Sequence, residues 1–518
     1  MDKKRINKSY FIFIIIAFVY AAGNFVWWSL NTPVIPSNIS SIHFLDIFQP
    51  GWLFYNAPIT TYIMRFMFFV FGKEYFDLLI IFVNYVFFLI PLYLIYKIGL
   101  ELKDKETGNI AMILFALVPA VYGLSRQYGH QEYRLMAATT FNMYCLIKSG
   151  YFSNRKWSVL YGISIGLGLM VKDEFHAYFL SQFIYVAFSS FKHEFTGQKL
   201  KNILTACLMG FLIACWHYLR PQIIDKIITD PLSEAVPIFA FDSLSVMTIG
   251  LCEKLLSPPI FVFFIMGFVY FIIEKSVKFR TIILLWFIFP WTMIMAMPHH
   301  KLPEYGMGFV PALVLMAAVF IGILKSRSYK KIIVIFIIIL GFAQYLDYSY
   351  SSKNLLTFNL VGDKIKYFDL QLLAYDRKKS EFVSKTVDYF EKKYKNNSFC
   401  IEDCPMPYCW EEYFMLFTMM KIKGFNVVNG YIEDKYYGLN MDIIVAVGKT
   451  EIIDGTLDER INRLRTDWRK RINKGYIDGT IEIFYTIKKN YVPFDVFYPF
   501  ESQDEKYKVT LFAKKTKN

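Results

Sequence analysis

Long apolar segments fill the first two thirds of the chain, and they constrain its fold more than any other feature. A helix needs about 20 mainly apolar residues to cross a bilayer, and residues 1–350 contain about eleven stretches near that length. The predicted spans are residues 10–28, 76–97, 108–125, 132–148, 157–172, 175–191, 202–219, 256–274, 281–297, 305–324 and 331–350. They predict a polytopic α-helical membrane protein.

Composition supports this fold class. Of 518 residues, 55% are hydrophobic and 19% charged, where an average soluble domain has about 25% charged residues. The mean hydropathy of +0.34 excludes a plain soluble enzyme, a disordered scaffold and a coiled coil. A net charge of +14 would suit nucleic acid. The basic residues instead lie in short clusters between apolar stretches, so membrane lipids are the expected partners and nucleic acid is not.

The first apolar segment predicts an uncleaved span. A basic start at Lys3, Lys4 and Arg5 resembles a signal peptide. The apolar run that follows is too long and, at Trp27 and Trp28, too aromatic for one.

The basic clusters set the expected orientation, because loops on the cytoplasmic side carry an excess of Lys and Arg. With the N-terminus in the cytoplasm, every basic cluster falls on the cytoplasmic side. The clusters are Lys3/Lys4/Arg5/Lys8, Lys97/Lys103/Lys105, Lys148/Arg155/Lys156, Lys192/Lys199/Lys201, Lys275/Lys278/Arg280 and Lys325/Arg327/Lys330/Lys331. We therefore expect a multi-pass protein of the inner or plasma membrane, with the loop 29–75 and residues 351–518 outside the cytoplasm.

Residues 351–518 differ from the rest, because charge rises and the apolar runs shorten. Predicted helices cover 380–395 and 411–423, and predicted strands cover 399–401, 442–447, 480–487 and 508–513. The chain is thus expected to have two parts, a transmembrane module at 1–350 and an extracytoplasmic soluble α/β domain at 351–518.

Three cysteines of this second part lie close together in sequence, at Cys400, Cys404 and Cys409. Outside the cytoplasm one disulfide among them is expected, with its pairing left open. A zinc site would need four ligands at suitable spacing, and no histidine lies nearby. No metal is therefore predicted here.

Four groups of ionisable residues fall at the external ends of the predicted spans. Charged groups near a membrane core are costly and tend to mark function. The groups are Asp46, then Arg126 to Arg134 with His130 and Glu132, then Lys172-Asp173-Glu174, then His299-His300-Lys301 followed by Glu304 and Tyr305. Each has a structural alternative, namely a helix cap, a polar turn or a snorkelling anchor. Their coincidence on one face favours a shared external site.

Four motifs follow one another along the first 350 residues. They are the segment from Tyr55 through Pro58 and Tyr62 to Gly72, Q-E-Y-R at Gln131–Arg134, G-L-G-L-M-V-K at Gly166–Lys172, and K-L-P-E-Y at Lys301–Tyr305 followed by Pro311. They resemble the stretches Y-x-x-P-P-L-x-x-W/Y, Q-E-x-R, G-L-A-L-L-T-K and K-L-P-x-Y…P of the GT-C polyprenyl-phosphate-sugar-dependent glycosyltransferases, in the group of protein O-mannosyltransferases and the lipid A aminoarabinose transferase (glycosyltransferase family 39-like). The resemblance covers roughly residues 10–350.

The chain also departs from the family pattern. An Asp-Glu pair is usual in the first external loop, whereas Asp46 is followed by Ile47. Ile59 replaces the second proline of the pair. Trp27-Trp28 is followed by Ser29, so the W-W-D-Y-G motif of oligosaccharyltransferases is missing.

The resemblance implies an inverting glycosyltransferase that moves a sugar from a polyprenyl-phosphate donor to a hydroxyl acceptor on the extracytoplasmic face. It implies Asp46 as general base and Glu132 as its partner or substitute. The implied donor-phosphate residues are Arg134, Lys301, Arg126, Lys172, His299 and His300, and the implied cavity residues are Tyr55, Pro58, Tyr62 and Tyr305. The family is not uniformly metal-dependent and no carboxylate cluster demands a metal, so no cofactor is expected.

The sequence is also compatible with two other functions. A transporter or flippase of a lipid-linked or anionic substrate would also span the membrane, although paired halves and broken mid-membrane spans are typical of such proteins. A membrane-anchored assembly protein would work through residues 351–518. Within the enzyme interpretation, the acceptor is a protein, a lipid or a surface glycan, and the sugar is not specified.

Overall fold

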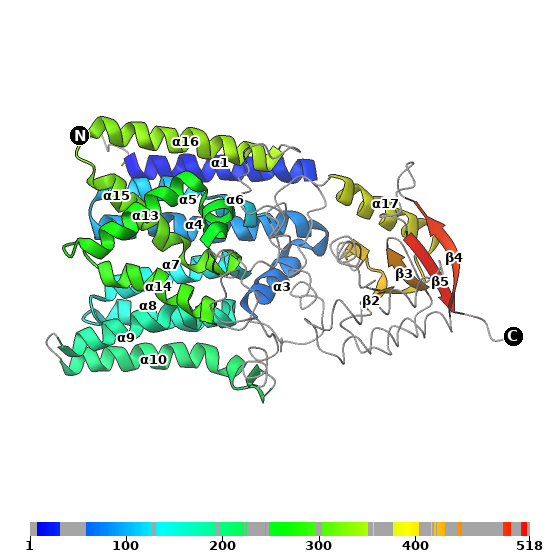
Figure 1. Ribbon diagram of the computed structural model, residues 1–518. Coiled ribbons are helices and arrows are strands. Elements are labelled where there is room, and N and C mark those ends of the chain that lie inside the picture. The colour runs from blue at the N-terminus through cyan, green and yellow to red at the C-terminus, as the bar shows by residue number, and fades with distance from the viewer. Residues whose placement is uncertain are drawn as a thin grey trace, which may run out of the picture.

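The structure is a computed structural model that describes residues 8–31, 58–126, 131–192, 196–221, 223–224, 244, 248–296, 303–350, 356, 377–402, 416, 419–420, 422–429, 443–447, 491–498 and 509–514. A bundle of long helices forms one part of the molecule, and a small α/β unit lies at one end of it (Figure 1). We call that end of the bundle the sheet end.

The bundle helices follow the predicted spans closely. They are α1 (Lys8–Asn31), α4 (Phe76–Leu102), α5 (Lys105–Ala116), α6 (Pro119–Leu124), α7 (Gln131–Ser149), α8 (Arg155–Val171), α9 (His176–Lys192), α10 (Gly197–Tyr218), α13 (Pro258–Ile273), α14 (Arg280–Ala296), α15 (Val310–Ile323) and α16 (Arg327–Tyr350). Short elements join them, namely the helix α3 (Ile59–Phe71), the 3₁₀ turns η1 (Lys73–Tyr75), η2 (Asp173–Phe175) and η4 (Pro303–Phe309), and the π-helical turn η3 (Leu251–Leu256).

The predicted span 108–125 is wrong as a single helix. It divides into α5 and α6, and Pro119 occupies the first turn of α6. Proline has no N–H to donate and fits the first turn of a helix, so it starts a new helix here.

Among the described residues, five helical stretches are long and apolar enough to cross a membrane, and they lie at 8–30, 73–102, 197–218, 305–323 and 327–350. The helices α3, α13 and α14 are apolar but shorter. The chain is thus a polytopic helical membrane protein, and the number of spans stays a prediction.

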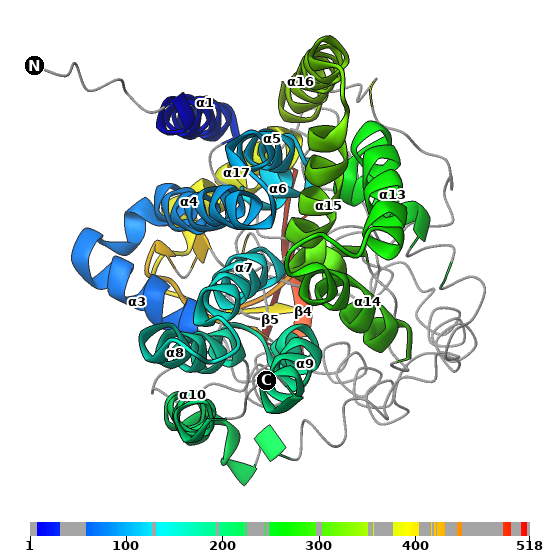
Figure 2. The same cartoon turned by 90° about the vertical axis from the view of Figure 1, so that its left-hand side faces the viewer.

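Burial separates central from peripheral helices. In the stretch at 305–323, which includes α15, 89% of the most apolar window is buried, against 17% for α1 and 33% each for α10 and α16. Viewed along the bundle, α15 and α7 lie inside, whereas α1, α10 and α16 lie at the periphery (Figure 2). The peripheral helices expose large apolar side chains such as Phe18, Leu208 and Ile339, as lipid-facing helices do.

The C-terminal part contains the helix α17 (Arg377–Lys393) and five strands. They are β1 (Ser398–Glu402), β2 (Asn426–Asn429), β3 (Ile443–Val447), β4 (Tyr491–Phe497) and β5 (Val509–Lys514), in the order β2-β1-β3-β5-β4. Strands β2 and β3 run parallel to β1, β5 runs antiparallel to β3, and β4 antiparallel to β5. The predictions for α17, β1, β3 and β5 are confirmed.

Two strands were missed. β2 is short, and β4 contains Pro493, where the register shifts before Asp495. Proline cannot donate to a ladder and is tolerated in an edge strand, which is where β4 lies in this sheet. The predicted strand 480–487, most of the predicted helix 411–423, and Cys404 and Cys409 lie outside the described residues. Cys400 lies in β1, where the structure describes the backbone alone.

The α/β unit has its own apolar core and also touches the bundle. Phe382 and Phe390 of α17 pack with Phe399 of β1 and Val445 of β3. Met419 packs against this core and also against the cluster of α3 and α4 that contains Met64. The boundary predicted at residue 350 agrees with the end of α16, while the domain division itself stays a prediction.

Candidate functional site

A buried ion pair lies at the sheet end of the bundle. Lys172 follows the last residue of α8, and Glu132 is in the first turn of α7. Lys172 Nζ lies 2.5 Å from Glu132 Oε1, and the two side chains are 9% and 3% exposed. Removing both charges from water is costly and is offset only where the geometry is good. The pair therefore fixes the start of α7 to the end of α8.

Two further groups hold the lysine. Glu174 of η2 lies 3.5 Å from Lys172 Nζ, and its side chain is 43% exposed. The ring of Tyr305 in η4 lies 4.7 Å from the same nitrogen, within the range of a cation–π contact. Lys172 thus has one buried carboxylate, one partly exposed carboxylate and an aromatic face around it.

Hydrogen bonds fix η4 beside this lysine. Tyr178 of α9 donates its hydroxyl to the carbonyl of Tyr305. Thr139 Oγ1 and Trp286 Nε1 both donate to the carbonyl of Gly308, at 2.8 and 2.9 Å. A side chain at Gly308 would collide with the Tyr178 ring, so glycine is needed for this close approach.

Glycine in the predicted G-L-G-L-M-V-K motif has a comparable role. A methyl group at Gly168 would lie 2.3 Å from the ring of Phe175, which is fully buried just after the Lys172 turn. The motif thus allows η2 to fold back onto α8. This is the local reason why Lys172 turns toward α7.

An arginine lies on the same first turns of α7. Arg134 is fully buried, and its Nη2 donates to Asn84 Oδ1 of α4 at 3.1 Å. Its guanidinium carbon lies 6.0 Å from the centre of the Phe87 ring. The Gln131–Arg134 motif therefore places a carboxylate toward α8 and a guanidinium toward α4.

The other described residues of the predicted site are more dispersed. Arg126 follows α6 and donates hydrogen bonds to side chains of α1 and α16. Pro58 accepts a hydrogen bond from the backbone of Tyr62 at the start of α3, and the Tyr62 ring lies 6.1 Å from that of Trp216 in α10. Asp46, Tyr55, His299, His300 and Lys301 lie outside the described residues. Glu132, Lys172 and Tyr305 are thus brought together, and Arg126 is turned to a different set of helices.

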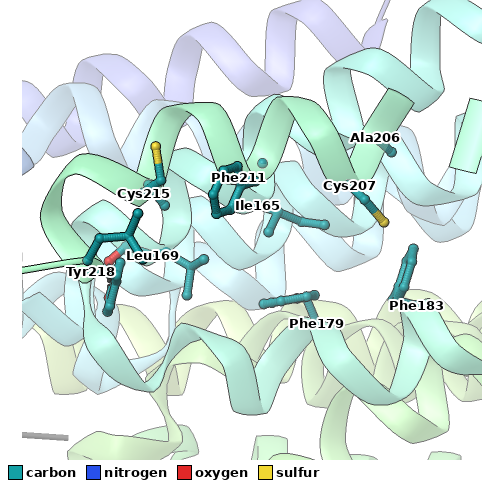
Figure 3. A pocket seen from close by; sticks show the side chains of 12 residues that line it. Ile165, Leu169, Phe179, Phe183, Ala206, Cys207, Phe211, Cys215 and Tyr218 are labelled. Atoms are coloured by element: carbon teal, nitrogen blue, oxygen red, sulfur yellow. Dashed lines mark hydrogen bonds between the residues drawn. The ribbon is translucent and has the colours of Figure 1, made fainter. Parts of the chain in front are cut away.

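An apolar cavity of about 320 Å³ lies between α8, α9 and α10. Its lining includes Leu169, Phe179, Phe183, Cys207, Phe211 and Tyr218, as Figure 3 shows. The Tyr218 hydroxyl donates to the Leu169 carbonyl at 2.7 Å and to Asp173 Oδ1 at 2.8 Å. Because Asp173 directly follows Lys172, the polar end of this cavity adjoins the ion pair through the chain.

Sequence reasoning missed three residues. Asn84 is a polar residue inside an apolar span, and this signal could have singled it out. Glu253 is only 1% exposed, within the π-helical turn η3, where such turns often mark functional positions. Tyr178 carries no signal that separates it from the other tyrosines. Among the described residues, no group of three His, Cys, Asp or Glu side chains could hold a metal ion.

Known proteins resemble this chain in sequence pattern over part of its length. The family model described as dolichyl-phosphate-mannose-protein mannosyltransferase matches residues 55–217, the segment that carries Glu132 and Lys172. No curated protein sequence matches the chain.

Solved structures match over nearly the whole chain. Apo ArnT from Cupriavidus metallidurans aligns with a TM-score of 0.57 at 10% identity, covering 96% of this chain and 97% of that chain. ArnT bound to undecaprenyl phosphate aligns at 0.56, with the same identity and coverage. The fold is that of the GT-C glycosyltransferases. The archaeal oligosaccharyltransferase AglB from Archaeoglobus fulgidus, in complex with an inhibitory peptide and a dolichol-phosphate, aligns at 0.53 and 10% identity, covering 95% of this chain and 73% of that chain.

The resemblance that the motifs indicated is therefore confirmed for the GT-C fold. The match extends through the C-terminal part, which the motifs did not cover. At 10% identity, the alignment does not assign roles to individual residues. Those roles are inferred from the geometry of this chain.

Proposed function

We propose that this GT-C chain is a membrane glycosyltransferase that moves a sugar from a polyprenyl-phosphate donor to a hydroxyl acceptor on the extracytoplasmic face. The observation that carries the proposal is the buried Lys172–Glu132 pair beside an apolar cavity, in a fold shared with two proteins solved with bound polyprenyl phosphates. A lysine cation suits the donor phosphate, and an apolar cavity suits the polyprenyl chain, so a site for this donor needs both features next to each other.

Lys172 is proposed to hold the donor phosphate. An ammonium on a lysine acts as a point charge toward phosphate oxygens, and Glu132 keeps it at one place. The carboxylate of Glu132 is itself fixed by the lysine, so it suits orientation of the cation better than proton abstraction. We therefore assign Glu132 to positioning and leave the general base to Asp46.

The cavity between α8, α9 and α10 is proposed to hold part of the polyprenyl chain. Its lining is apolar except near Tyr218, and that end adjoins the lysine turn. The distribution of basic clusters favours an extracytoplasmic position for this end of the bundle. An apolar tail would thus lie among membrane helices while its phosphate reaches the external surface.

The proposed reaction is an inverting displacement. The anomeric C–O bond to the donor phosphate breaks as the acceptor oxygen bonds to the same carbon from the opposite side. The acceptor proton passes to the Asp46 carboxylate, and the polyprenyl phosphate leaves as an anion beside Lys172. Stabilising this departing charge is the main demand on the site. The acceptor is a protein, a lipid or a surface glycan.

A transfer assay tests the proposal. Purified protein in membranes receives radiolabelled undecaprenyl-phosphate sugars and a crude envelope acceptor. We expect label transfer by the wild type, its loss in Asp46→Asn, and a partial loss in Glu132→Gln with a raised KM for the donor. Transfer that survives Asp46→Asn but stops completely in Glu132→Gln would move the base to Glu132. No transfer from any of a panel of donor sugars would contradict the function.

A further inference from the structure

The Arg126 guanidinium is fully buried just beyond α6. Its Nε donates to Asn24 Oδ1 of α1 at 3.0 Å, and its Nη1 donates to Ser349 Oγ of α16 at 2.8 Å. The rings of Trp27 and Tyr345 lie 5.2 and 5.3 Å from its guanidinium carbon. Two neutral acceptors and two aromatic faces therefore surround a full positive charge.

This charge has no anionic partner within the described part of the chain. No carboxylate there lies within 4.0 Å of the guanidinium, and Arg126 Nη2 is buried without a hydrogen-bond acceptor. Asp347, two residues before Ser349, accepts instead from the backbone N–H of Leu356 at 2.7 Å. A buried charge without a counter-charge is costly, and the described side chains supply no anion for this one.

The position of the cluster indicates where an anion would come from. Asn24 and Ser349 lie near the sheet ends of α1 and α16, and both helices are peripheral (Figure 2). Their neighbours Phe25 and Leu346 are 58% and 43% exposed on the outer surface of the bundle. An anion that lies between these two helices would therefore come from the surrounding lipid.

The cluster is also separate from the ion pair. Lys172 contacts Glu132, Glu174 and Tyr305, on α7, η2 and η4. The side-chain hydrogen bonds of Arg126 go instead to α1 and α16. The two cations therefore serve two places, although sequence reasoning assigned both to the donor phosphate.

We propose that Arg126 is a second anion site, which binds the phosphate of a membrane lipid between the sheet ends of α1 and α16. The Nη2 group donates to a phosphate oxygen, and Arg is the side chain suited to such planar recognition. The flanking rings hold the guanidinium in plane, and the apolar outer surfaces of α1 and α16 accommodate the lipid tails. The site does not depend on the proposed transfer reaction.

Native mass spectrometry of the full chain in detergent tests the site. The probes are undecaprenyl phosphate, phosphatidylglycerol and phosphatidylcholine, each titrated alone, with inorganic phosphate as a competitor. We expect Arg126→Gln to lose one retained phosphate-bearing lipid, and Arg126→Lys to weaken that binding roughly tenfold, because a charged hydrogen bond is lost. Arg280→Gln is the matched control, since the Arg280 guanidinium already donates to the carbonyls of Phe271 and Ile272.

The outcomes show which lipid supplies the phosphate, and they distinguish failure of this site from failure of the proposed function. Loss of undecaprenyl phosphate alone identifies the carrier lipid as the ligand, and loss of phosphatidylglycerol alone identifies an ordinary anionic phospholipid. Equal retention of every probe by wild type and Arg126→Gln would overturn the site and leave Arg126 as a helix clamp. If Arg126→Gln does not fold, Arg126→Lys and Ser349→Ala make the same comparison. Because both sites can hold undecaprenyl phosphate, the number of bound copies is counted. A Lys172→Met variant that binds as many copies as wild type would count against the proposed function and not against this site.

Discussion

Two buried cations at the same end of the bundle are stabilised in opposite ways. Lys172 has a carboxylate 2.5 Å from its nitrogen and a second at 3.5 Å. Arg126 has two neutral acceptors, two aromatic rings and no carboxylate partner among the described residues. The carboxylates hold the Lys172 ammonium at one position, whereas the described residues leave the Arg126 charge without a carboxylate partner. Burial alone therefore does not tell a cation that has a carboxylate partner from one that has none among the described residues.

The largest expected effect is on transfer. Lys172→Met removes the charge proposed for the leaving phosphate, so we expect transfer to fall roughly 100-fold or more, with partial recovery in Lys172→Arg. The matched control is Lys148→Met, because Lys148 also pairs with a glutamate, Glu101, at 2.8 Å, with both side chains about one third exposed. Initial rates at saturating donor measure the difference. Equal rates in both variants would remove Lys172 from the site.

The second effect is on stability. Lys172→Met or Glu132→Gln alone disturbs a buried pair, and losing one partner of such a pair costs about 3–5 kcal/mol. The double variant leaves no buried charge unpaired between these two positions, so we expect it to be more stable than Lys172→Met. The corresponding cycle at Lys148 and Glu101 should give about 1 kcal/mol or less, because water reaches both side chains and screens that pair.

Denaturant unfolding of detergent-solubilised protein measures both cycles. Coupling energies of equal size at the two pairs would contradict the claim that burial makes the Lys172–Glu132 pair special.

The cavity beside Lys172 provides the third test. Cys207 is exposed and lines the cavity, whereas the next residue, Leu208, is 54% exposed and does not line it. Cys207→Trp should fill the space and weaken binding of a long-chain polyprenyl phosphate about tenfold, while sparing a donor with a short chain. At roughly 25 cal/mol per Å², a tenfold change corresponds to about 60 Å² less apolar surface buried by the tail.

Leu208→Trp adds the same ring on the outer side and should leave both donors unaffected. The measurement is the KM of the two donors for each variant. A parallel loss for long and short chains in Cys207→Trp would place the tail elsewhere.

The fold could be predicted from the sequence in large part, with failures at two prolines. Apolar length predicted nearly every bundle helix, because a span must satisfy its own backbone hydrogen bonds within one segment. The prediction from apolar length failed at Pro119, because this proline divides one apolar stretch into two helices. Strand β4 was missed because Pro493 interrupts its pattern, and only the edge position and the register shift make the proline tolerable.

The site was predictable only in part. Lys172 and Glu132 were proposed separately from two motifs, and their pairing depends on how α7 and α8 pack, which no local pattern encodes. Arg126 was grouped with them because all three are expected on the same side of the membrane. Only the contacts with Asn24 and Ser349 reveal that it belongs to other helices. The sequence thus predicted at which end of the bundle each residue lies, but not which side chains each residue contacts there.

The smallest expected effect concerns an anion that has both neutral and charged partners, because Lys393 Nζ lies 3.7 Å from the Asp495 carboxylate. Asp495 of β4 accepts hydrogen bonds from the hydroxyls of Tyr389 and Tyr394, at 2.5 and 2.6 Å. Burial alone would raise the pKa of Asp495, but these hydrogen bonds and the charge of Lys393 lower it below its usual value. Because the pKa is depressed in the folded state, the stabilisation is present above about pH 4 and is lost as pH falls through the folded pKa.

We expect Asp495→Asn to destabilise β4 by about 1 kcal/mol at pH 7 and to have no effect once the pH is low enough to protonate the folded-state carboxyl. Hydrogen exchange of peptides covering 491–497 in the full chain measures this local opening, with Asp388→Asn on α17 as control. If wild type and Asp495→Asn differ equally at neutral and acidic pH, the hydroxyls would not be recognising the charged carboxylate.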